Sequence, residues 1–286
     1  MSEIEVSNAE SIVQGIDHLI MMVGNLEAAE QLWQRLGFAT TARGFHRTGG
    51  TANHLIMLEG TYLELLGMAN PGSPPVYRDM MENPGLWGVA LRGSAQATFR
   101  LWSAGGFQVA APEDLARGVE IDGRSELARF RLTMLERSPQ LPFLLFCCEH
   151  LTPQFVWHSK LPAHPNGARR LRELVVLVED GVTRRSFERI AGHAALGGTP
   201  EEASLVLGDS RIALVAAGAF EKRFGVAARF GKRRAPLLAG FVLASDNVDR
   251  ARQFAETAGC AVRDTATGFV AHLPDEGVLI EWSPDA

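Results

Sequence analysis

Apolar residues in this chain follow two alternating patterns, a helical spacing and short continuous runs, and the order of the patterns repeats. The segment NLEAAEQLWQRLGFAT at 25–40 has apolar residues at helical spacing, an asparagine at its start, an acidic residue in the first turn and a glycine near its end. The segment NVDRARQFAETAGCAV at 247–262 has the same features in the same order. Both are predicted to be helices with an asparagine N-cap and a glycine stop, and their likeness indicates an internal repeat.

The repeat continues beyond these helices into apolar segments that read as strands. GTANHLIMLEGTYLELLGM at 50–68 parallels GFVAHLPDEGVLIEWSP at 268–284. Two weaker copies lie between the outer ones and begin with LWGVALR at 86–92 and LRELVVLVED at 171–180. Each copy reads as a strand, a helix and then two or three strands, so the chain is predicted to contain four βαβββ modules.

Pairing of the modules is expected because a unit of about 50 residues is too small to bury its own sheet well. The expected pairs are 12–160 and 168–286, each a curved mixed sheet with its helices outside, which gives an α+β fold class. The segment TPQFVWHSKLPAHPNGARR at 152–170 is rich in proline and contains the turn sequence HPNG. It is therefore predicted to be an irregular connection between the two pairs.

One carboxylate stands inside an apolar strand, in the run GTYLELLG at 60–67. A buried carboxylate needs a partner, so Glu64 is expected to meet a cation, a metal ion or water. Alternation along the predicted strands puts Tyr62 and Glu64 on one face, and it puts His18 on the face opposite to Leu19. The helix at 26–36 is expected to cover the purely apolar face, which leaves His18 and Glu64 facing the other way.

Composition and charge remove several function classes. The formal net charge of -5 and the isoelectric point near 5.9 lack the basic balance expected of a nucleic-acid-binding chain, and the basic cluster RFGKRRAP at 229–236 is interpreted as a solvated linker. No apolar run approaches the ~20 residues that span a bilayer, and the acidic start lacks the order of a signal peptide. Three cysteines make no disulfide framework, which favours a reducing cytoplasm.

Three short motifs in the first module resemble those of the vicinal oxygen chelate superfamily, specifically its glyoxalase-like branch. They are DHLIMMV at 17–23, GGTAN at 49–53 and YLELL at 62–66. In that superfamily, two βαβββ modules form a curved sheet around a cup, and a divalent metal is held by side chains from the first and last strands of the modules. The likeness extends through LPFLLF to HPNGA, over about 155 residues, and implies a glyoxalase/dihydroxybiphenyl dioxygenase-like fold there. For the last half of the chain, the same fold is expected from the repeat alone.

The resemblance also implies a site. It puts a divalent ion, either zinc, iron, nickel or manganese, on His18 and Glu64, with Glu64 as the catalytic carboxylate. The two further ligands of the family pattern fall at Gly88 and near Phe146, which cannot bind metal. The residues interpreted as contacts of the bound compound are His46, Thr51, Asn53, Tyr62, His158 and His164.

Two functions remain open at this point. One is a metal-dependent lyase, isomerase or dioxygenase that binds a small carbonyl or vicinal-oxygen compound. The other is a metal-free protein that sequesters an apolar small molecule in the same cup, and Gly88 with Phe146 favour it. The expected partner is a small molecule, with neither nucleic acid nor membrane, and the chain is expected to be a monomer or a homodimer. The pair 168–286 is expected to be scaffold, because Glu173 and Glu281 lack histidine partners there.

Overall fold

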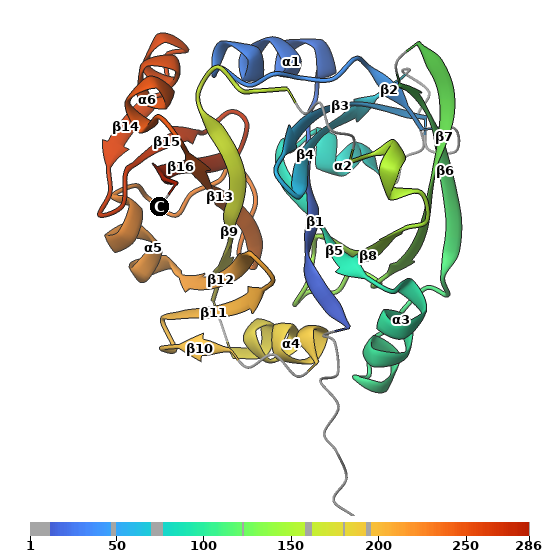
Figure 1. Ribbon diagram of the computed structural model, residues 1–286. Helices are drawn as coiled ribbons and strands as arrows, with labels where there is room; N and C mark the ends of the chain where they lie inside the picture. Colours follow the sequence, from blue (N-terminus) through green and yellow to red (C-terminus); the bar gives the residue numbers. More distant parts are fainter. Residues whose placement is uncertain are drawn as a thin grey trace, which may run out of the picture.

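The computed structural model describes residues 12–46, 50–69, 77–121, 123–157, 162–179, 181–192 and 196–285. Its strands form two eight-stranded mixed sheets, which lie side by side in Figure 1. The strands of the first sheet are β1 (Val13–Met22), β2 (Gly44–Phe45), β3 (Thr51–Leu58), β4 (Thr61–Met68), β5 (Gly85–Gly93), β6 (Glu113–Ile121), β7 (Arg124–Met134) and β8 (Leu144–His150). Those of the second are β9 (Ala168–Val178), β10 (Gly197–Gly198), β11 (Glu202–Leu207), β12 (Ser210–Ala216), β13 (Leu237–Ser245), β14 (Ala261–Asp264), β15 (Phe269–Leu273) and β16 (Val278–Pro284).

The two sheets share one topology, which confirms the four predicted βαβββ modules. The strand order is β2-β3-β4-β1-β5-β8-β7-β6 in the first sheet and β10-β11-β12-β9-β13-β16-β15-β14 in the second. In each sheet the first strands of two modules pair antiparallel at the centre, and each first strand pairs parallel with the last strand of its own module. In the described part of 152–170, the only regular structure before β9 is the 3₁₀ helix η2 (Pro153–Phe155).

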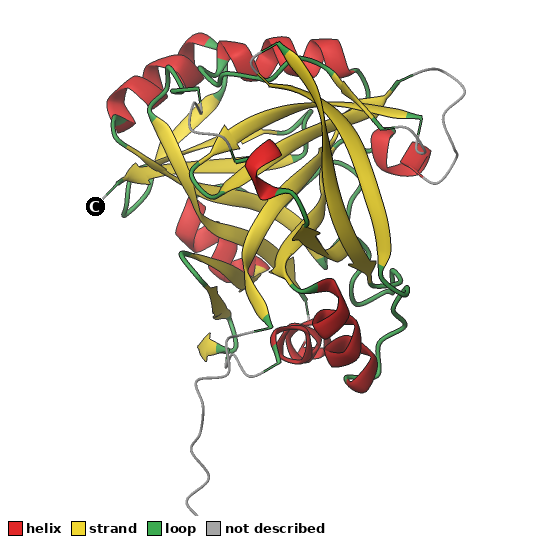
Figure 2. Cartoon of the chain, turned by 45° about the vertical axis from the view of Figure 1, so that its right-hand side comes forward, coloured by secondary structure: helices red, strands yellow, loops and turns green. Residues whose placement is uncertain are grey.

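The helices that follow the first strand of each module lie outside the sheets. They are α1 (Leu26–Arg35), α3 (Ala95–Ala104), α4 (Gly181–Ala191) and α6 (Val248–Thr257). Helix α1 contacts α6 at the top of Figure 1 and α3 contacts α4 at the bottom, and Figure 2 shows these pairs beyond the strands. Two further helices, α2 (Arg78–Met81) and α5 (Ala217–Phe224), connect one module to the next.

The predicted caps of α1 and α6 are present. The side chain of Asn25 accepts a hydrogen bond from the backbone amide of Ala28 at 3.0 Å, and Asn247 accepts one from Arg250 at 2.9 Å. Both helices are followed by a glycine with positive φ, at Gly37 and Gly259 in the chain.

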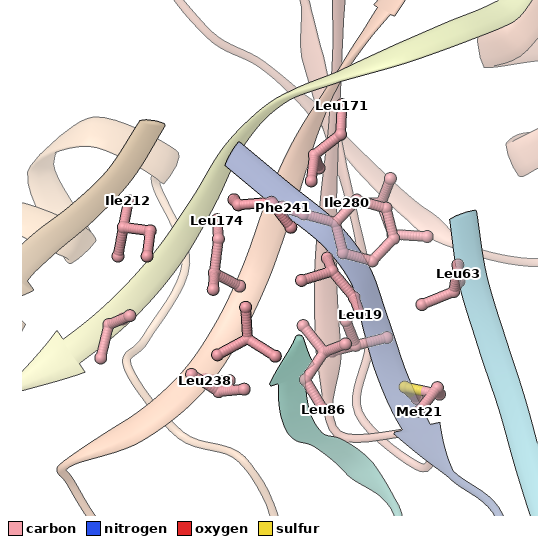
Figure 3. Packing of buried hydrophobic residues seen from close by; sticks show 14 of the residues in the cluster. Leu19, Met21, Leu63, Leu86, Leu171, Leu174, Ile212, Leu238, Phe241 and Ile280 are labelled. Atoms are coloured by element: carbon pink, nitrogen blue, oxygen red, sulfur yellow. The ribbon is translucent and has the colours of Figure 1, made fainter. Parts of the chain in front are cut away.

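The main apolar core lies between the two sheets, as Figure 3 shows. Leu19 and Met21 of β1 belong to the same buried cluster as Leu174 of β9 and both Leu238 and Phe241 of β13. The expectation that the helix at 26–36 covers the apolar face of β1 is therefore wrong, because the second sheet covers that face. Two apolar sheet faces bury more area against each other than one helix can cover, and α1 instead packs near the edge, on β3 and β4.

We expect Phe241→Ala to lower the free energy of unfolding by about 3–5 kcal/mol, because it leaves a cavity in the contact between the sheets. Phe241 is buried, and its ring stacks near that of Trp33 at a centroid distance of 6.4 Å. Phe45→Ala is the matched control, since Phe45 is 61% exposed and its loss is expected to change stability by no more than about 0.5 kcal/mol. Urea unfolding of both variants measures the difference, and equal effects would contradict this account of the core.

Candidate functional site

Glu64 lies buried in the cup of the first sheet, surrounded by nitrogen atoms. Its Oε1 accepts a hydrogen bond of 2.6 Å from the side-chain amide of Asn53. His46 Nε2 lies 3.6 Å from Oε1, and His18 Nε2 lies 3.9 Å from Oε2. The partners of this carboxylate are therefore two imidazoles and an amide.

Strand pairing explains why these groups meet. β1 runs parallel to β4, with His18 opposite Tyr62 and Ile20 opposite Glu64. Side chains two residues apart on a strand share a face, so the His18 and Glu64 side chains project to the same side. Tyr62 then stacks on the imidazole of His18, with ring centroids 4.4 Å apart and planes 9° from parallel, which fixes the orientation of the imidazole.

A second carboxylate, Asp17, orients His18 from behind. Asp17 is fully buried, its Oδ2 lies 2.7 Å from His18 Nδ1, and His150 Nε2 lies 3.1 Å from the same oxygen. Burial alone raises the pKa of Asp17, but the hydrogen bonds with His150 and His18 outweigh it and hold the pKa well below its ordinary value. An ionised carboxylate only accepts hydrogen bonds, so we assign the proton of His18 to Nδ1 and the lone pair to Nε2, on the side of Glu64.

Sequence reasoning missed Asp17. Strict alternation would point Asp17 and His18 to opposite faces of β1, away from each other. The pairing of β1 with β5 is irregular between Ile16 and His18, and the two neighbouring side chains hydrogen-bond there. The acidic residue directly before His18 in the motif DHLIMMV was the only available signal.

The cup encloses a cavity of about 230 Å³. The lining has a polar group of four residues: His18, His46, Thr51 and Glu64. The rest of the wall is mainly apolar and aromatic. The remaining lining residues are Ile20, Tyr62, Leu66, Tyr77, Leu115, Arg117, Phe130, Leu132, Met134, Leu144, Phe146 and Cys148. Such a distribution suits a small ligand that is held at one end by polar contacts and is otherwise buried among apolar groups.

In the complementary half of the cup, the two positions that correspond to His18 and Glu64 offer no ligand. β1 pairs with β5 so that His18 lies opposite Ala90 and Ile20 lies opposite Gly88. The pseudo-twofold axis between the modules therefore equates Gly88 with His18, and the parallel pairing of β5 with β8 equates Phe146 with Glu64. A Cβ atom at Gly88 would lie 2.9 Å from the Cδ1 atom of Ile20, so a side chain at this position would require Ile20 to shift.

The other residues singled out in the sequence lie in different places. The structure does not bring His164 to the cup: its Nδ1 accepts from the Ala39 amide at 3.1 Å and its Nε2 donates to the Met57 carbonyl at 2.8 Å. His164 therefore ties the connection between the two halves to the loop at Ala39 and to strand β3. His158 lies outside the described residues. Asn53 reaches the site through Glu64 and does not line the cavity itself.

A second trio near His18 also has the composition of a metal site. One ligand atom each from Asp17, His18 and Cys148 lies within 4.8 Å of the other two. Burial, and then the charge of Asp17, raise the pKa of the Cys148 thiol well above its ordinary value. An ion bound there would have to displace the proton of the Cys148 thiol and the hydrogen bonds that Asp17 already accepts.

The cup of the second sheet is a wider hollow of about 1220 Å³ with a different charge arrangement. Its buried carboxylates, Glu173 and Glu281, face the guanidinium of Arg223 from α5. Nη2 of Arg223 lies 2.7 Å from Glu173 and 3.5 Å from Glu281. Arg211 also forms an ion pair with Glu173, so two cations of the chain compensate these two carboxylates. Sequence reasoning missed Arg223, because α5 follows the last strand of the third module and lies outside the predicted βαβββ pattern.

A family model described as "Glyoxalase-like domain" matches residues 16–191. This chain belongs to that family. The glyoxalase-like protein is thereby a member of the vicinal oxygen chelate superfamily, which confirms the resemblance expected from the three motifs. No curated protein matches the chain. Among described residues, no helix is long and apolar enough to cross a membrane.

Solved structures share the fold of this glyoxalase-like protein at low sequence identity. A hypothetical protein from Staphylococcus aureus is 11% identical with a TM-score of 0.64, over 94% of this chain and 98% of its own. A 4-hydroxymandelate synthase mutant from Streptomyces coelicolor is 13% identical with a TM-score of 0.58, over 96% and 94%. A xylose isomerase-like TIM barrel/4-hydroxyphenylpyruvate dioxygenase fusion protein is 16% identical with a TM-score of 0.58, over 97% of this chain and 50% of its own. At these identities the likeness shows the fold alone.

We expect acid to destabilise this protein in part through His164. Burial lowers the pKa of His164 below its ordinary value, and the hydrogen bond to Met57 only partly opposes this. The unfolded chain therefore binds the proton more readily than the folded chain. The stability contributed by neutral His164 is present above pH about 6.5 and is lost as the pH falls toward the lower folded-state pKa.

The measurement is urea unfolding at several pH values between 5 and 8 for the wild type and for His164→Gln. The difference in free energy of unfolding between the two is expected to shrink as the pH falls. A difference that grows as the pH falls would show that protonated His164 stabilises the fold, against this interpretation.

Proposed function

We propose that the cup of the first sheet binds a small carbonyl or vicinal-oxygen compound through a divalent metal ion held by His18 and Glu64, with His46 as a third ligand. The observation that carries the proposal is the hydrogen bond between Asp17 and His18, which directs the Nε2 lone pair of His18 toward Glu64. A histidine that ligates a metal typically donates its other ring N–H to a carboxylate in this way.

The residue types of this donor set suit an ion, but the side chains would have to move toward a common point. His46 and His18 approach different oxygens of Glu64, at 3.6 and 3.9 Å, and these three residues are not a trio with all ligand atoms within 4.8 Å of one another. Two donors bound at about 2.0–2.2 Å to one ion lie roughly 3–3.5 Å apart, so ion binding would draw the two imidazoles together around Glu64. Two histidines and one carboxylate are a ligand set of non-haem iron sites and are also compatible with zinc. Because Gly88 and Phe146 supply no ligand, the remaining coordination positions stay open to a bound compound.

Each protein group has a role in this proposal. When bound, the ion would polarise a carbonyl group or stabilise a developing oxyanion. Glu64 would be the catalytic carboxylate, because it would help to hold the ion and it lines the cavity that the compound would occupy; Asn53 holds it in place. Asp17 keeps His18 in the required tautomer. The wall around Phe130 and Phe146 excludes water from the reacting end of the compound.

A metal-free binding protein is the second candidate function. The missing ligands at Gly88 and Phe146 favour it, and so does the largely apolar lining of the cavity. In this case His18 and His46 donate or accept hydrogen bonds from the bound molecule, and affinity comes chiefly from the apolar wall.

Metal content separates the two candidates. We expect protein purified without chelator to contain close to one equivalent of a transition metal by elemental analysis. His18→Ala and Glu64→Ala are expected to lower that content by at least about tenfold, since each removes a bond to the ion. His272→Ala is the matched control, because His272 is a partly buried histidine of β15 in the second sheet and does not line the first cup.

The outcomes differ clearly between the candidates. Loss of metal in His18→Ala and Glu64→Ala, with none in His272→Ala, supports the metal-dependent function. Wild-type protein that carries no metal, takes up none on dialysis against zinc, iron(II), nickel or manganese, and still binds small aromatic ligands in chelator would rule out the first candidate in favour of the second.

A further inference from the structure

One cationic side chain lines the first cup from a strand that lies on the other side of the central pair β1–β5 from β4, the strand of Glu64. Arg117 comes from β6, the edge strand at the far end of the sheet, and it lines the same cavity as His18 and Glu64. It is the single lysine or arginine among the lining residues of this cavity. The two edge strands of the sheet, β2 and β6, contact each other, so the strand that carries Arg117 helps to close the cup.

Arg117 interrupts an otherwise apolar row. Leu115 precedes it by two residues and lines the cavity, and Val119 follows by two and packs into the same cluster. A strand that only closed the cup would be expected to continue this row with an apolar residue. The guanidinium lies 5.9 Å from the ring centroid of Phe130, so an aromatic face supports its position.

The guanidinium has no carboxylate partner. Among the described residues, Arg117 forms no ion pair and no side-chain hydrogen bond, whereas Arg131 on the neighbouring strand pairs with Asp114 at 2.6 Å. Its charge nevertheless reaches the inside of the cup. Burial raises the pKa values of Tyr62 and Cys148, and the positive charge of Arg117 acts on both in the opposite direction.

The charges of the cup favour an anion. With a divalent ion, the carboxylate of Glu64 and the guanidinium of Arg117, the lining carries a formal charge of +2 when the histidines are neutral. An arginine that lacks a partner in a partly buried, mainly apolar cavity is suited to a planar carboxylate, which it can bind through two parallel hydrogen bonds. The volume of about 230 Å³ is below the ~300–1,000 Å³ of pockets for drug-sized molecules, so the ligand is small.

We infer that the compound bound in the first cup is a small carboxylate, with its carboxyl group on Arg117, an apolar or aromatic body against Phe130 and Phe146, and its vicinal oxygens at the His18–Glu64 end. This inference rests on the proposed function for the oxygen-binding end, and it adds the substrate class and a specificity-determining residue. Arg117 does not contact the reacting atoms in this arrangement. It positions the ligand and selects for charge.

The experiment uses two probes of nearly equal shape that differ in charge, 3,4-dihydroxybenzoate and 3,4-dihydroxybenzamide. Calorimetry on zinc-loaded protein measures the dissociation constant of each. We expect the wild type to bind the acid at least about tenfold more tightly than the amide, and we expect Arg117→Met to lose that preference while its affinity for the amide stays unchanged. Arg117→Lys is expected to recover part of the preference, since it restores the charge without the planar fork.

Arg129→Met is the matched control. Arg129 is exposed on β7, next to β6, and does not line the cavity, so this variant is expected to bind both probes as the wild type does. Zinc content is measured in every variant and is expected to be the same in Arg117→Met as in the wild type. If Arg117→Met weakens the binding of acid and amide equally, Arg117 has a packing role only and the inference is overturned. The inference is also overturned if the wild type binds both probes with equal affinity, or if it does not bind the acid at millimolar concentration.

The same titrations in chelator separate this inference from the proposed function. If the protein holds no zinc but its preference for the acid still depends on Arg117, the metal-dependent function fails and the assignment of Arg117 stands. If zinc binds through His18 and Glu64 but the preference for the acid is absent, the assignment of Arg117 fails and the metal site stands.

Discussion

The apolar contact between the two sheets decides which face of each central strand is available for chemistry. Leu19 and Met21 of β1 are committed to that contact, so the alternate residues His18 and Ile20 must face the cup. A shift of β1 by one residue would bury His18 between the sheets and expose leucine to the cup, which fixes the register firmly. The place of the candidate site is thus set by packing on the opposite side of the strand.

Buried carboxylates occur in both cups, and the structure neutralises them in two ways. In and behind the first cup, the close partners of Glu64 and Asp17 are mainly imidazoles, which can gain or lose a proton, together with the amide of Asn53, which donates a hydrogen bond to Glu64. In the second cup, Glu173 and Glu281 share Arg223, whose charge is permanent. A bound ligand or ion can therefore still change the net charge around the carboxylates of the first cup. The carboxylates of the second cup are already paired with arginine side chains of the chain itself.

Much of the fold could be predicted from sequence because it repeats. The capped helices and the spacing of apolar segments are local patterns, and they identified four modules and their pairing without any knowledge of long-range contacts. The predicted helix cover of β1 was wrong because nothing local shows that two sheets will pack against each other. The alternation of side chains along strands predicted that His18 and Glu64 face the same cup. The same rule predicted that Asp17 points away from His18, and their hydrogen bond forms only because the pairing of β1 is irregular there. Arg117 and Arg223 were missed for another reason: each acts across the sheet, from a strand or helix far away in sequence.

The absence of a side chain at Gly88 also limits how this sequence can change. A side chain at that position would crowd Ile20, which would have to shift or become smaller. Phe146 would also have to become polar before a fourth donor existed, so a single substitution to histidine or glutamate at Gly88 cannot rebuild the complementary half of a symmetric four-ligand site. Intermediate sequences on that route would carry either a steric clash or an unpaired buried polar group, and both lower stability. The first cup therefore stays asymmetric for two reasons. Two ligand positions carry no donor, and a neighbouring side chain, Ile20, fills part of the space that a new ligand at Gly88 would need.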